Sequence, residues 1–328
     1  MTVGSKIRSV SEPVLVTGAS GFGGSHLVDL LIQEDAPVIG WHRRAGGSRE
    51  ANSVRWMAVD VLDAAAVRRA SAETRPAVIY HLAGAAHTAE SWRSTANTLE
   101  SNVIGTHHLL EAVRIAGLSS RVLIPGSALV YRPSTEALSE DSPLGPRSPY
   151  ATSKLAQERL GLHVAAEDAL PVFVTRSFNH AGPRQDSSFS TSSFARQLAK
   201  IEAGLLEPVI RVGNLEARRD VTDVRDVVRA YKAIVERGRP ARPYNVCSGC
   251  SYRIADLLQQ LVDQAYVRVE IRTEPERMRP NDMPLLLGSA QRIQEEVGWA
   301  PHITIERTLG DLLEYWRRET RGERVGEG

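Results

Sequence analysis

Short apolar runs alternate with helical patterns through the first half of the chain. Runs of strand length, rich in β-branched and apolar residues, predict buried strands at 14–17, 37–41, 54–59, 77–82 and 121–125. Apolar residues at helical spacing predict helices between them, one carrying Leu27, Leu30 and Leu31 and others at 63–72 and 95–116. This alternation predicts an α/β fold with a doubly wound parallel sheet, which binds ligands beyond the carboxyl ends of its strands.

The second half has the same alternation with shorter elements. We expect helices at 195–204, 254–266, 291–297 and 305–317, a helix opened by Asp223, and strands at 208–212, 244–246 and 267–271. These elements suit a smaller, interleaved α/β lobe. The predicted organisation is therefore a loose leader at 1–12, a dinucleotide-binding domain of the Rossmann type at 13–180 with late elements at about 220–247, and a mostly substrate-binding lobe at 181–328.

A glycine turn follows the first strand and opens the first helix. Gly18, Gly21 and Gly24 stand three residues apart, with Ser20 and Phe22 between them. Gly18 permits a tight turn, Gly21 lets the backbone approach a pyrophosphate at the helix N-terminus, and Gly24 lets helix and strand pack closely. Strand, glycine turn and helix together predict a dinucleotide site at these five residues.

The end of the second strand bears on the choice of cofactor. An NAD site places a carboxylate there for the ribose hydroxyls, whereas this chain has His42, Arg43 and Arg44. An arginine at this position accommodates a 2′-phosphate. The pattern favours NADP(H), with NAD(H) possible; the alternative is two solvated arginines in a loop.

A helix start at Ser148 and Pro149 carries the candidate chemistry. Serine is a favoured N-cap, and proline is favoured at the first helical position. Tyr150 and Lys154 are four residues apart and therefore share one helix face. An ammonium beside a tyrosine favours the phenolate, so the pair can exchange a proton with an alcohol or ketone oxygen. The alternative is two solvated helix residues.

The net charge, the apolar runs and the cysteine content argue against several other functions. The chain has 40 basic and 39 acidic residues, for a net charge of +1, so its charge draws it to neither nucleic acid nor membrane. No apolar run approaches the length of a membrane span, and we expect a cytoplasmic protein. The two cysteines, Cys247 and Cys250, form one C-x-x-C; zinc needs two more soft ligands, so we expect two thiols and no metal.

Taken together, these motifs resemble the extended short-chain dehydrogenase/reductase family, in the branch that acts on nucleotide sugars. The resemblance covers nearly the whole chain. Its markers are the glycine turn, His81-Leu82-Ala83-Gly84-Ala85-Ala86-His87, Asn102 with Gly105-Thr106, Ser127 with Val130-Tyr131, Tyr150 with Lys154, and the segment from Arg176 to Pro183.

The resemblance implies a role for each candidate residue. Tyr150 would be the general acid/base, Lys154 would hold the nicotinamide ribose, and Ser127 would hydrogen-bond the reacting carbonyl. Asp60 and Val61 would lie by the adenine, and Leu82 and Ala83 beside the cofactor. The implied substrate-binding residues are His87, Asn179, Arg219 and Arg279.

The two arginines, Arg219 and Arg279, suit a diphosphate because a guanidinium presents paired donors in a fixed fork. The alternative is surface ion pairs with Asp220, Asp223 or Asp282.

One departure from the family bears on the reaction. The 4,6-dehydratases of the family follow the catalytic hydroxyl with an acidic residue, and this chain has Ala128 and Leu129 there. A second departure is Pro125-Gly126, where small hydroxyl residues are more usual. Within the family, the runs 212–220, 222–226 and 244–249 are most similar to the GDP-4-keto-6-deoxy-mannose reductases, relatives of the GDP-mannose 4,6-dehydratases.

The resemblance therefore implies an NADPH-dependent reduction of the C4 keto group of a nucleoside-diphosphate 4-keto-6-deoxyhexose, with GDP as the favoured nucleotide. A nucleotide-sugar 4-epimerase with tightly bound NAD is the alternative, followed by a 4,6-dehydratase and by a non-catalytic dinucleotide sensor. Family members pair the helices at 95–116 and 149–166 in a homodimer, and we expect one here.

Overall fold

The computed structural model describes residues 12–43, 53–278 and 283–326, and the side chains of this last range up to residue 322. The chain divides into two compact units. The first consists of Met1–Gly126, Ser148–Val174 and Arg239–Arg242, and the second of Ser127–Arg147, Thr175–Gly238 and Pro243–Gly328. Each unit is built from segments that are far apart in the sequence.

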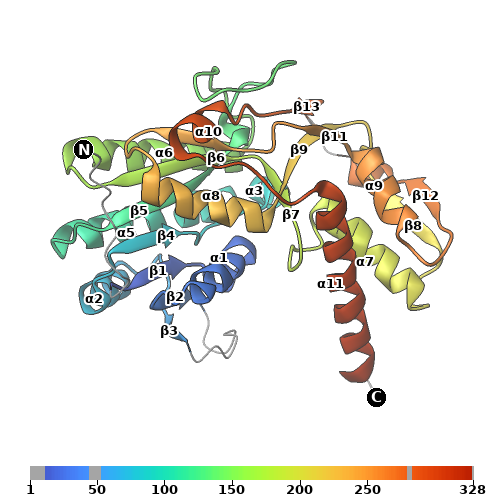
Figure 1. Cartoon of the computed structure of the whole chain (residues 1–328), viewed down its shortest axis with the longest axis horizontal. Coiled ribbons are helices and arrows are strands. Elements are labelled where there is room, and N and C mark those ends of the chain that lie inside the picture. Colours follow the sequence, from blue (N-terminus) through green and yellow to red (C-terminus); the bar gives the residue numbers. More distant parts are fainter. Residues whose placement is uncertain (1–11, 44–52, 279–282, 327–328) are drawn as a thin grey trace, which may run out of the picture. The chain divides into compact units, whose positions relative to one another are not determined.

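A seven-stranded sheet is the main element of the fold (Figure 1). Its strand order is β10-β6-β5-β4-β1-β2-β3. The chain thus builds outward from β1 in one direction and then from β4 in the other, which is the doubly wound arrangement predicted. The strands are β1 (Val14–Thr17), β2 (Val38–His42), β3 (Val54–Ala58), β4 (Val78–His81), β5 (Arg121–Ser127), β6 (Val172–Ser177) and β10 (Pro243–Val246).

Parallel register brings the ends of the central strands to one edge. Thr17, the last residue of β1, is level with Trp41 of β2 and with His81 of β4. All residues of β1 and β2 are buried, which explains why these strands are continuous apolar runs in the sequence. The glycine turn and the segment after β4 therefore leave the sheet side by side.

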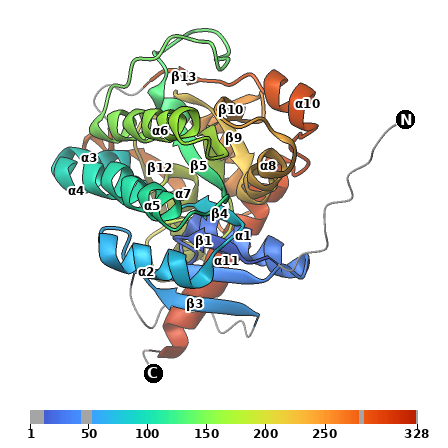
Figure 2. The same cartoon turned by 90° about the vertical axis from the view of Figure 1, so that its left-hand side faces the viewer.

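The helices of the first unit cover this part of the sheet. They are α1 (Phe22–Gln33), α2 (Ala64–Thr74), α3 (Thr88–Arg93), α4 (Thr95–Leu99), α5 (Gly105–Ile115) and α6 (Pro149–Glu167). Figure 2 shows α2, α5 and α6 next to one another. Their core joins Leu109 and Val113 of α5 to Leu15 and Ile79 of the sheet.

The predicted long helix at 95–116 is interrupted. Residues Glu100–Ile104 form a π-helical turn between α4 and α5, and the short helix α3 before them was not predicted. The Gly105 amide donates to the Glu100 carbonyl five residues earlier, which makes room for one extra residue in the turn. Such π turns are rare in proteins, and those that occur often lie at functional sites.

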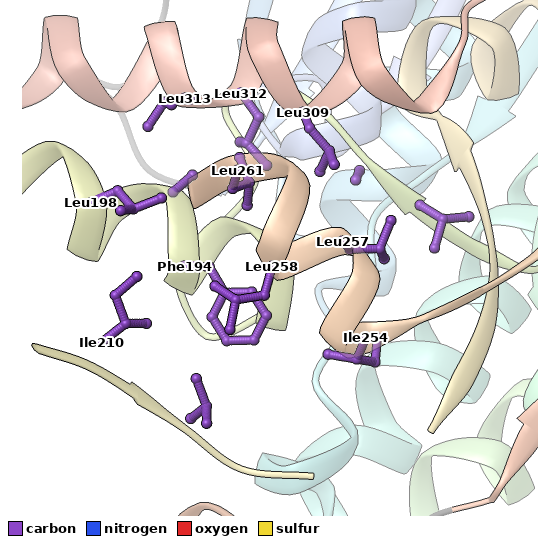
Figure 3. Packing of buried hydrophobic residues seen from close by; sticks show 14 of the residues in the cluster. Phe194, Leu198, Ile210, Ile254, Leu257, Leu258, Leu261, Leu309, Leu312 and Leu313 are labelled. Atoms are coloured by element: carbon purple, nitrogen blue, oxygen red, sulfur yellow. The ribbon is translucent and has the colours of Figure 1, made fainter. Parts of the chain in front are cut away.

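The second unit has its own helical core, shown in Figure 3. Leucines of α9 (Ile254–Asp263) pack between α7 (Ser190–Glu202) and α11 (Ile305–Gly326). The buried residues at the centre include Phe194, Leu198, Leu257, Leu258, Leu261, Leu309, Leu312 and Leu313. The remaining helices are α8 (Val224–Arg237), which Asp223 caps as predicted, and α10 (Gln291–Val297).

Small sheets complete this unit. One contains β7 (Asn179–Ala181), β9 (Arg218–Asp223), β11 (Ser251–Arg253) and β13 (Leu285–Leu286), and the other pairs β8 (Val209–Val212) with β12 (Glu270–Thr273). Strand β9 was missed because half of it is the charged run Arg218-Arg219-Asp220, which has no apolar pattern. Two other bounds were displaced: the helix predicted at 195–204 begins at Ser190, and the strand predicted at 267–271 lies at 270–273.

Candidate active site

The glycine turn is packed against the segment that follows β4. Gly18 has φ +63°, and a Cβ at this position would lie 2.8 Å from the Ala83 nitrogen. A Cβ on Gly24 would lie 2.1 Å from the Gly18 carbonyl oxygen. Both positions therefore require glycine, one for its backbone angle and the other for the close approach of helix and turn. Leu82 and Ala83 lie directly beside the turn, as predicted from the sheet.

The N-terminus of α1 presents backbone amides that no side chain caps. Its N-cap is Gly21, no side chain bonds there, and the first turn has no acidic residue. Ser20 and Gly21 are exposed, and Phe22 is half-buried with its ring edge-on to His26. A glycine N-cap and the positive end of the helix dipole suit a pyrophosphate, so this chain's residues fit the dinucleotide.

The residues predicted for the adenosine end lie beyond β2 and β3. His42 is the buried last residue of β2, and its ring meets Trp56 edge-on at 5.9 Å. Arg43 follows it and is exposed, whereas Arg44 lies outside the described residues. The Asp60 carboxylate accepts a hydrogen bond from the Leu62 amide at 3.0 Å, which makes a tight turn. Val61, half-buried beside it, accepts from His108 through its carbonyl.

Helix α6 begins where the sequence predicts. The Ser148 side chain accepts from the Ala151 amide at 3.1 Å, and Pro149 occupies the first position. The backbone of Tyr150 is held on both sides. Its amide donates to Ser91 Oγ at 3.2 Å, and its carbonyl accepts from Ser153 Oγ at 2.7 Å. These contacts fix the start of the helix that carries the candidate acid.

Asn102, in the π turn, joins α6 to the segment after β4. Its Oδ1 accepts from the Ala85 amide at 2.8 Å, and its Nδ2 donates to the Ala85 carbonyl at 3.2 Å and to Ser153 Oγ at 2.8 Å. A Cβ on Gly84 would lie 2.5 Å from Asn102 Oδ1, so this segment also needs a glycine. The amide thus orders the segment beside the glycine turn and the helix of Tyr150 at once.

Lys154 lies half-buried one turn after Tyr150. Its Nζ donates to Gln157 Oε1 at 2.5 Å. Burial lowers the pKa of Lys154 to about 8, so the amine can lose its proton close to neutral pH. Burial, and next the charge of Lys154, lower the pKa of His81 to about 3, and His81 is therefore neutral.

His87 was predicted to contact substrate. It is exposed and precedes α3 as its N-cap. It follows the Gly84–Ala85 segment that Asn102 holds, in the same unit as Tyr150.

Three other predicted residues belong to the second unit. Ser127 ends β5, is buried, and its Oγ accepts from the Leu129 amide at 3.2 Å. Asn179 is the exposed first residue of β7 and pairs with Val221 of β9. Arg219 lies in β9, and its guanidinium donates to the carbonyls of Arg218 and Met283. Arg279 and Asp282 lie outside the described residues.

The carboxylates beside Arg219 are bound by other groups. Asp220 accepts from the Ser248 amide and hydroxyl and from the amides of Gly249 and Gly288. Its burial, partly offset by these bonds, raises its pKa. Asp223 bonds Arg225 and Thr308. Other groups therefore already bind both carboxylates that were considered as ion-pair partners of Arg219.

The cysteines are both free thiols. Cys247 is buried, and burial raises its pKa well above the ordinary value, whereas Cys250 is exposed. Within the part of the chain that the structure describes, no group of three or more His, Cys, Asp and Glu residues could hold a metal ion. Over the same residues, no helix combines the length and the apolar character that crossing a membrane requires.

Three polar residues of this region were not singled out from the sequence. They are Thr17, Ser153 and Gln157, and all are buried, as is Thr106, which was named only as a family marker. The spacing of Gln157, three residues after Lys154, was a usable signal because residues three apart share a helix face. Thr17 gave no such signal, since its contacts come from other elements, and Thr106 was a family marker to which no role was assigned.

The fold and the glycine turn, followed by the tyrosine–lysine helix, define an enzyme of the extended short-chain dehydrogenase/reductase class. The family model described as GDP-mannose 4,6 dehydratase matches residues 15–312. The chain belongs to this family. The class and the family are thus those predicted from its motifs.

Individual relatives cover the chain almost from end to end. GDP-6-deoxy-D-mannose reductase of Pseudomonas aeruginosa is 37% identical over 317 residues, which are 96% of this chain and 100% of the relative. GDP-mannose 4,6-dehydratase of Vibrio cholerae is 25% identical, over 91% of this chain and 92% of the relative.

Solved structures agree with these matches. The structure of RMD from Pseudomonas aeruginosa complexed with NADPH superposes with a TM-score of 0.84 at 34% identity, over 94% of this chain and all of the other. UDP-glucose 4-epimerase from Thermotoga maritima, solved with UDP-glucose, also gives a TM-score of 0.84, at 27% identity over 94% of this chain and 99% of the other.

Proposed function

We propose that this protein reduces the C4 keto group of a GDP-linked 4-keto-6-deoxyhexose, with NADPH as the hydride donor. The observation that carries the proposal is the segment after Ser127. Ala128 is buried and Leu129 half-buried, and neither side chain can transfer a proton. A 4,6-dehydratase needs an acid there to remove water, whereas a ketoreductase does not. The 37% identity to a GDP-6-deoxy-D-mannose reductase supports the same choice.

The residues of the first unit would bind and orient the cofactor. The amides at the start of α1 would bind the pyrophosphate, and Asp60 and Val61 would lie beside the adenine. Lys154 would bond the nicotinamide ribose. When bound, the cofactor supplies a hydride to the C4 carbon of the sugar. Leu82 and Ala83, which lie against the glycine turn, would close one side of this site.

Tyr150 would supply the proton. As the carbonyl carbon gains the hydride, negative charge develops on its oxygen, and the Tyr150 hydroxyl protonates it. The Lys154 ammonium stabilises the phenolate that remains. The Ser127 hydroxyl would donate a second hydrogen bond to the same oxygen. The reaction consumes one proton and one hydride for each alcohol that forms.

The rest of the substrate would contact the second unit. Arg219 and Arg279 would bind the diphosphate, and Asn179 would contact the sugar or the diphosphate. His87 would complete the sugar site. Two observations support this role for Arg219: it is half-exposed on β9, and the neighbouring Asp220 carboxylate is bound by other groups.

The preference for NADPH rests on the end of β2. Arg43 is exposed directly after the strand, at the position where a carboxylate would select NAD. The NADPH complex of the similar reductase supports this choice. The proposal places the enzyme in the cytoplasm, where NADPH and nucleotide sugars are available.

We further propose a homodimer through α4, α5 and α6. Exposed apolar side chains on this side of the first unit support it, because they suit an interface: Trp92, Leu99 and Ile104 are 62%, 37% and 43% exposed. Light scattering after size exclusion measures the mass directly.

The decisive assay is oxidation of NADPH with GDP-4-keto-6-deoxy-mannose, generated by a separate dehydratase. We expect NADPH to be consumed and a GDP-6-deoxyhexose to form, whose C4 configuration NMR determines. The resemblance to UDP-glucose 4-epimerase makes epimerisation the second candidate. Interconversion of fully hydroxylated nucleotide sugars without added cofactor, together with no NADPH oxidation, would reverse the assignment.

A further inference from the structure

The partner of Lys154 belongs to a buried chain of hydrogen bonds. Gln157 takes the Lys154 ammonium on its Oε1 and donates from its Nε2 to Thr106 Oγ1 at 2.7 Å. Thr106 Oγ1 lies 3.0 Å from His81 Nε2, and His81 Nδ1 lies 2.9 Å from Thr17 Oγ1. Thr17 Oγ1 accepts from the Ala83 amide at 3.0 Å. The chain runs from α6 through α5 and β4 to the residue before the glycine turn.

Only one assignment of protons satisfies every member. The Thr106 hydroxyl donates its single proton to the Asn102 carbonyl at 2.7 Å, so it must accept from both Gln157 and His81. His81 therefore carries its proton on Nε2, and its Nδ1 accepts from the Thr17 hydroxyl. A neutral imidazole has one donor and one acceptor nitrogen, so the lowered pKa of His81 agrees with this assignment. The amide of Gln157 is fixed as well, with its oxygen toward Lys154.

This fixed orientation has a chemical consequence for Lys154. A carboxamide oxygen that cannot turn away offers the ammonium a permanent acceptor, which favours the charged amine over the neutral one. The same chain cannot pass protons onward, because its members are a neutral amide, two hydroxyls with fully used bonds and a neutral imidazole. The chain of hydrogen bonds therefore positions Lys154 and does not remove its proton.

We propose that Gln157 is the positioning residue for Lys154, and that Thr106, His81 and Thr17 hold Gln157 in place from the interior of the sheet. The proposal rests on the proposed function only in taking Lys154 as the lysine of the active site. It links the lysine to the glycine turn, so that the cofactor-binding segment and the helix of Tyr150 share one rigid support.

The chain is well suited to a direct test because it contains only four lysines: Lys6, Lys154, Lys200 and Lys232. NMR of protein labelled with ¹³C-lysine can follow each Cε signal against pH in the full chain without cofactor or substrate. The Lys154 signal is assigned by its loss in Lys154→Met. The titratable groups considered beside it are His81 from β4, whose pKa the charge of Lys154 lowers, and Tyr150, four residues earlier in the same helix.

Two substitutions of Gln157 should move the Lys154 titration in opposite directions. In Gln157→Leu the ammonium loses its acceptor, and we expect the midpoint to fall by about one pH unit. In Gln157→Glu a carboxylate faces the ammonium, and we expect the midpoint to rise by about one pH unit or more. The surface substitution Gln33→Leu, at the exposed end of α1, should leave it unchanged.

Thr106→Val tests the rest of the chain, since it removes the support of Gln157 without touching Lys154. We expect it to lower the midpoint in the same direction as Gln157→Leu, and the double variant to lower it no further than Gln157→Leu alone. If folded Gln157→Glu and Thr106→Val both titrate like the wild type, the proposal is wrong. Because no substrate is present, an incorrect substrate assignment would leave this result intact and would show only in the NADPH assay.

Discussion

At the scale of single residues, the candidate reacting groups differ from the residues that hold them in place through hydrogen bonds. Tyr150 and Lys154 were predicted from their spacing, because a helix places residues four apart on one face, together with the other motifs of the family. The residues that support them could not be predicted in this way. Gln157 contacts Thr106, and Ser153 contacts Asn102, between elements that are about fifty residues apart in the chain, and no local pattern encodes such contacts. The sequence therefore indicates candidate reacting groups more readily than the groups that hold them in place.

Replacing Tyr150 by phenylalanine removes the proposed acid and keeps the ring. We expect Tyr150→Phe to lower kcat by about 10²- to 10⁴-fold, the usual contribution of acid catalysis. NADPH affinity, measured by fluorescence titration, should not change. Tyr266→Phe, at a tyrosine that is 79% exposed, serves as the matched control. Undiminished turnover in Tyr150→Phe would contradict the assigned role.

The pKa of Lys154 predicts how the reduction depends on pH. Burial lowers this pKa from 10.5 to about 8, so the ammonium is present below pH 8 and is lost as the pH rises above it. Since the proposed mechanism uses the ammonium to stabilise the Tyr150 phenolate, kcat should be level below this pH and fall above it. A pH–rate profile measured where the protein stays folded checks this, and a rate that climbs steadily above pH 9 would refute it.

Arg43 allows a residue-scale test of the cofactor preference. Loss of a charge-assisted bond to a 2′-phosphate should weaken NADPH binding about tenfold or more in Arg43→Ala. NADH binding should stay the same, because NADH has no phosphate there. Arg114→Ala is a suitable control, since this exposed arginine lies at the end of α5, before β5 begins. Equal losses for both cofactors would assign Arg43 a general structural role.

At the scale of elements, glycine, serine and proline residues at turns and helix caps made several ends of helices and strands predictable. Strand β1 and the start of α6 lie where their turn and cap residues indicate. Strand β9 and the π turn escaped prediction for different reasons. The charged half of β9 is shaped by the partners it meets, Ser248 and Gly288 among them, and the π turn has the same residue composition as an ordinary helix.

The close approach of α1 to the glycine turn predicts unequal effects at two adjacent glycines. A Cβ on Gly24 would lie 2.1 Å from a backbone oxygen, whereas on Gly23 it would meet only Leu82 Cδ2 at 3.5 Å. We expect Gly24→Ala to cost about 1–3 kcal/mol of stability and to weaken NADPH binding. Gly23→Ala should unfold at or above the wild-type temperature in a thermal melt. Similar melting temperatures for the two variants would argue against this packing.

At the scale of the whole molecule, the proposed function assigns different binding roles to the two units. All the residues proposed for the pyrophosphate, adenine and nicotinamide ends of the cofactor lie in the first unit, whereas Ser127 and the proposed contacts to the substrate diphosphate lie in the second. The sequence predicted both the parallel sheet and a second lobe. Units built from interleaved segments have boundaries that depend on long-range contacts, and a one-dimensional pattern cannot show them.

This division predicts that stability and cofactor binding can be separated. Leu261 is fully buried between α7 and α11, far in sequence from the glycine turn. Leu261→Ala should cost about 2–5 kcal/mol in urea unfolding and leave the NADPH dissociation constant nearly unchanged. Leu205→Ala, at a leucine that is 45% exposed, should cost little. A large loss of NADPH affinity in folded Leu261→Ala would show that the units do not act separately.

The π turn at Glu100–Ile104 also constrains how this protein can evolve. One extra residue is accommodated there, and its removal would restore regular α-helical bonding from Thr95 to Ile115. Removal would also rotate everything on one side of the turn by about 100°, the angle between successive helical residues. Asn102 could then no longer reach both Ala85 and Ser153. A deletion here would therefore give a shorter and more regular helix but would disconnect the two segments that Asn102 joins.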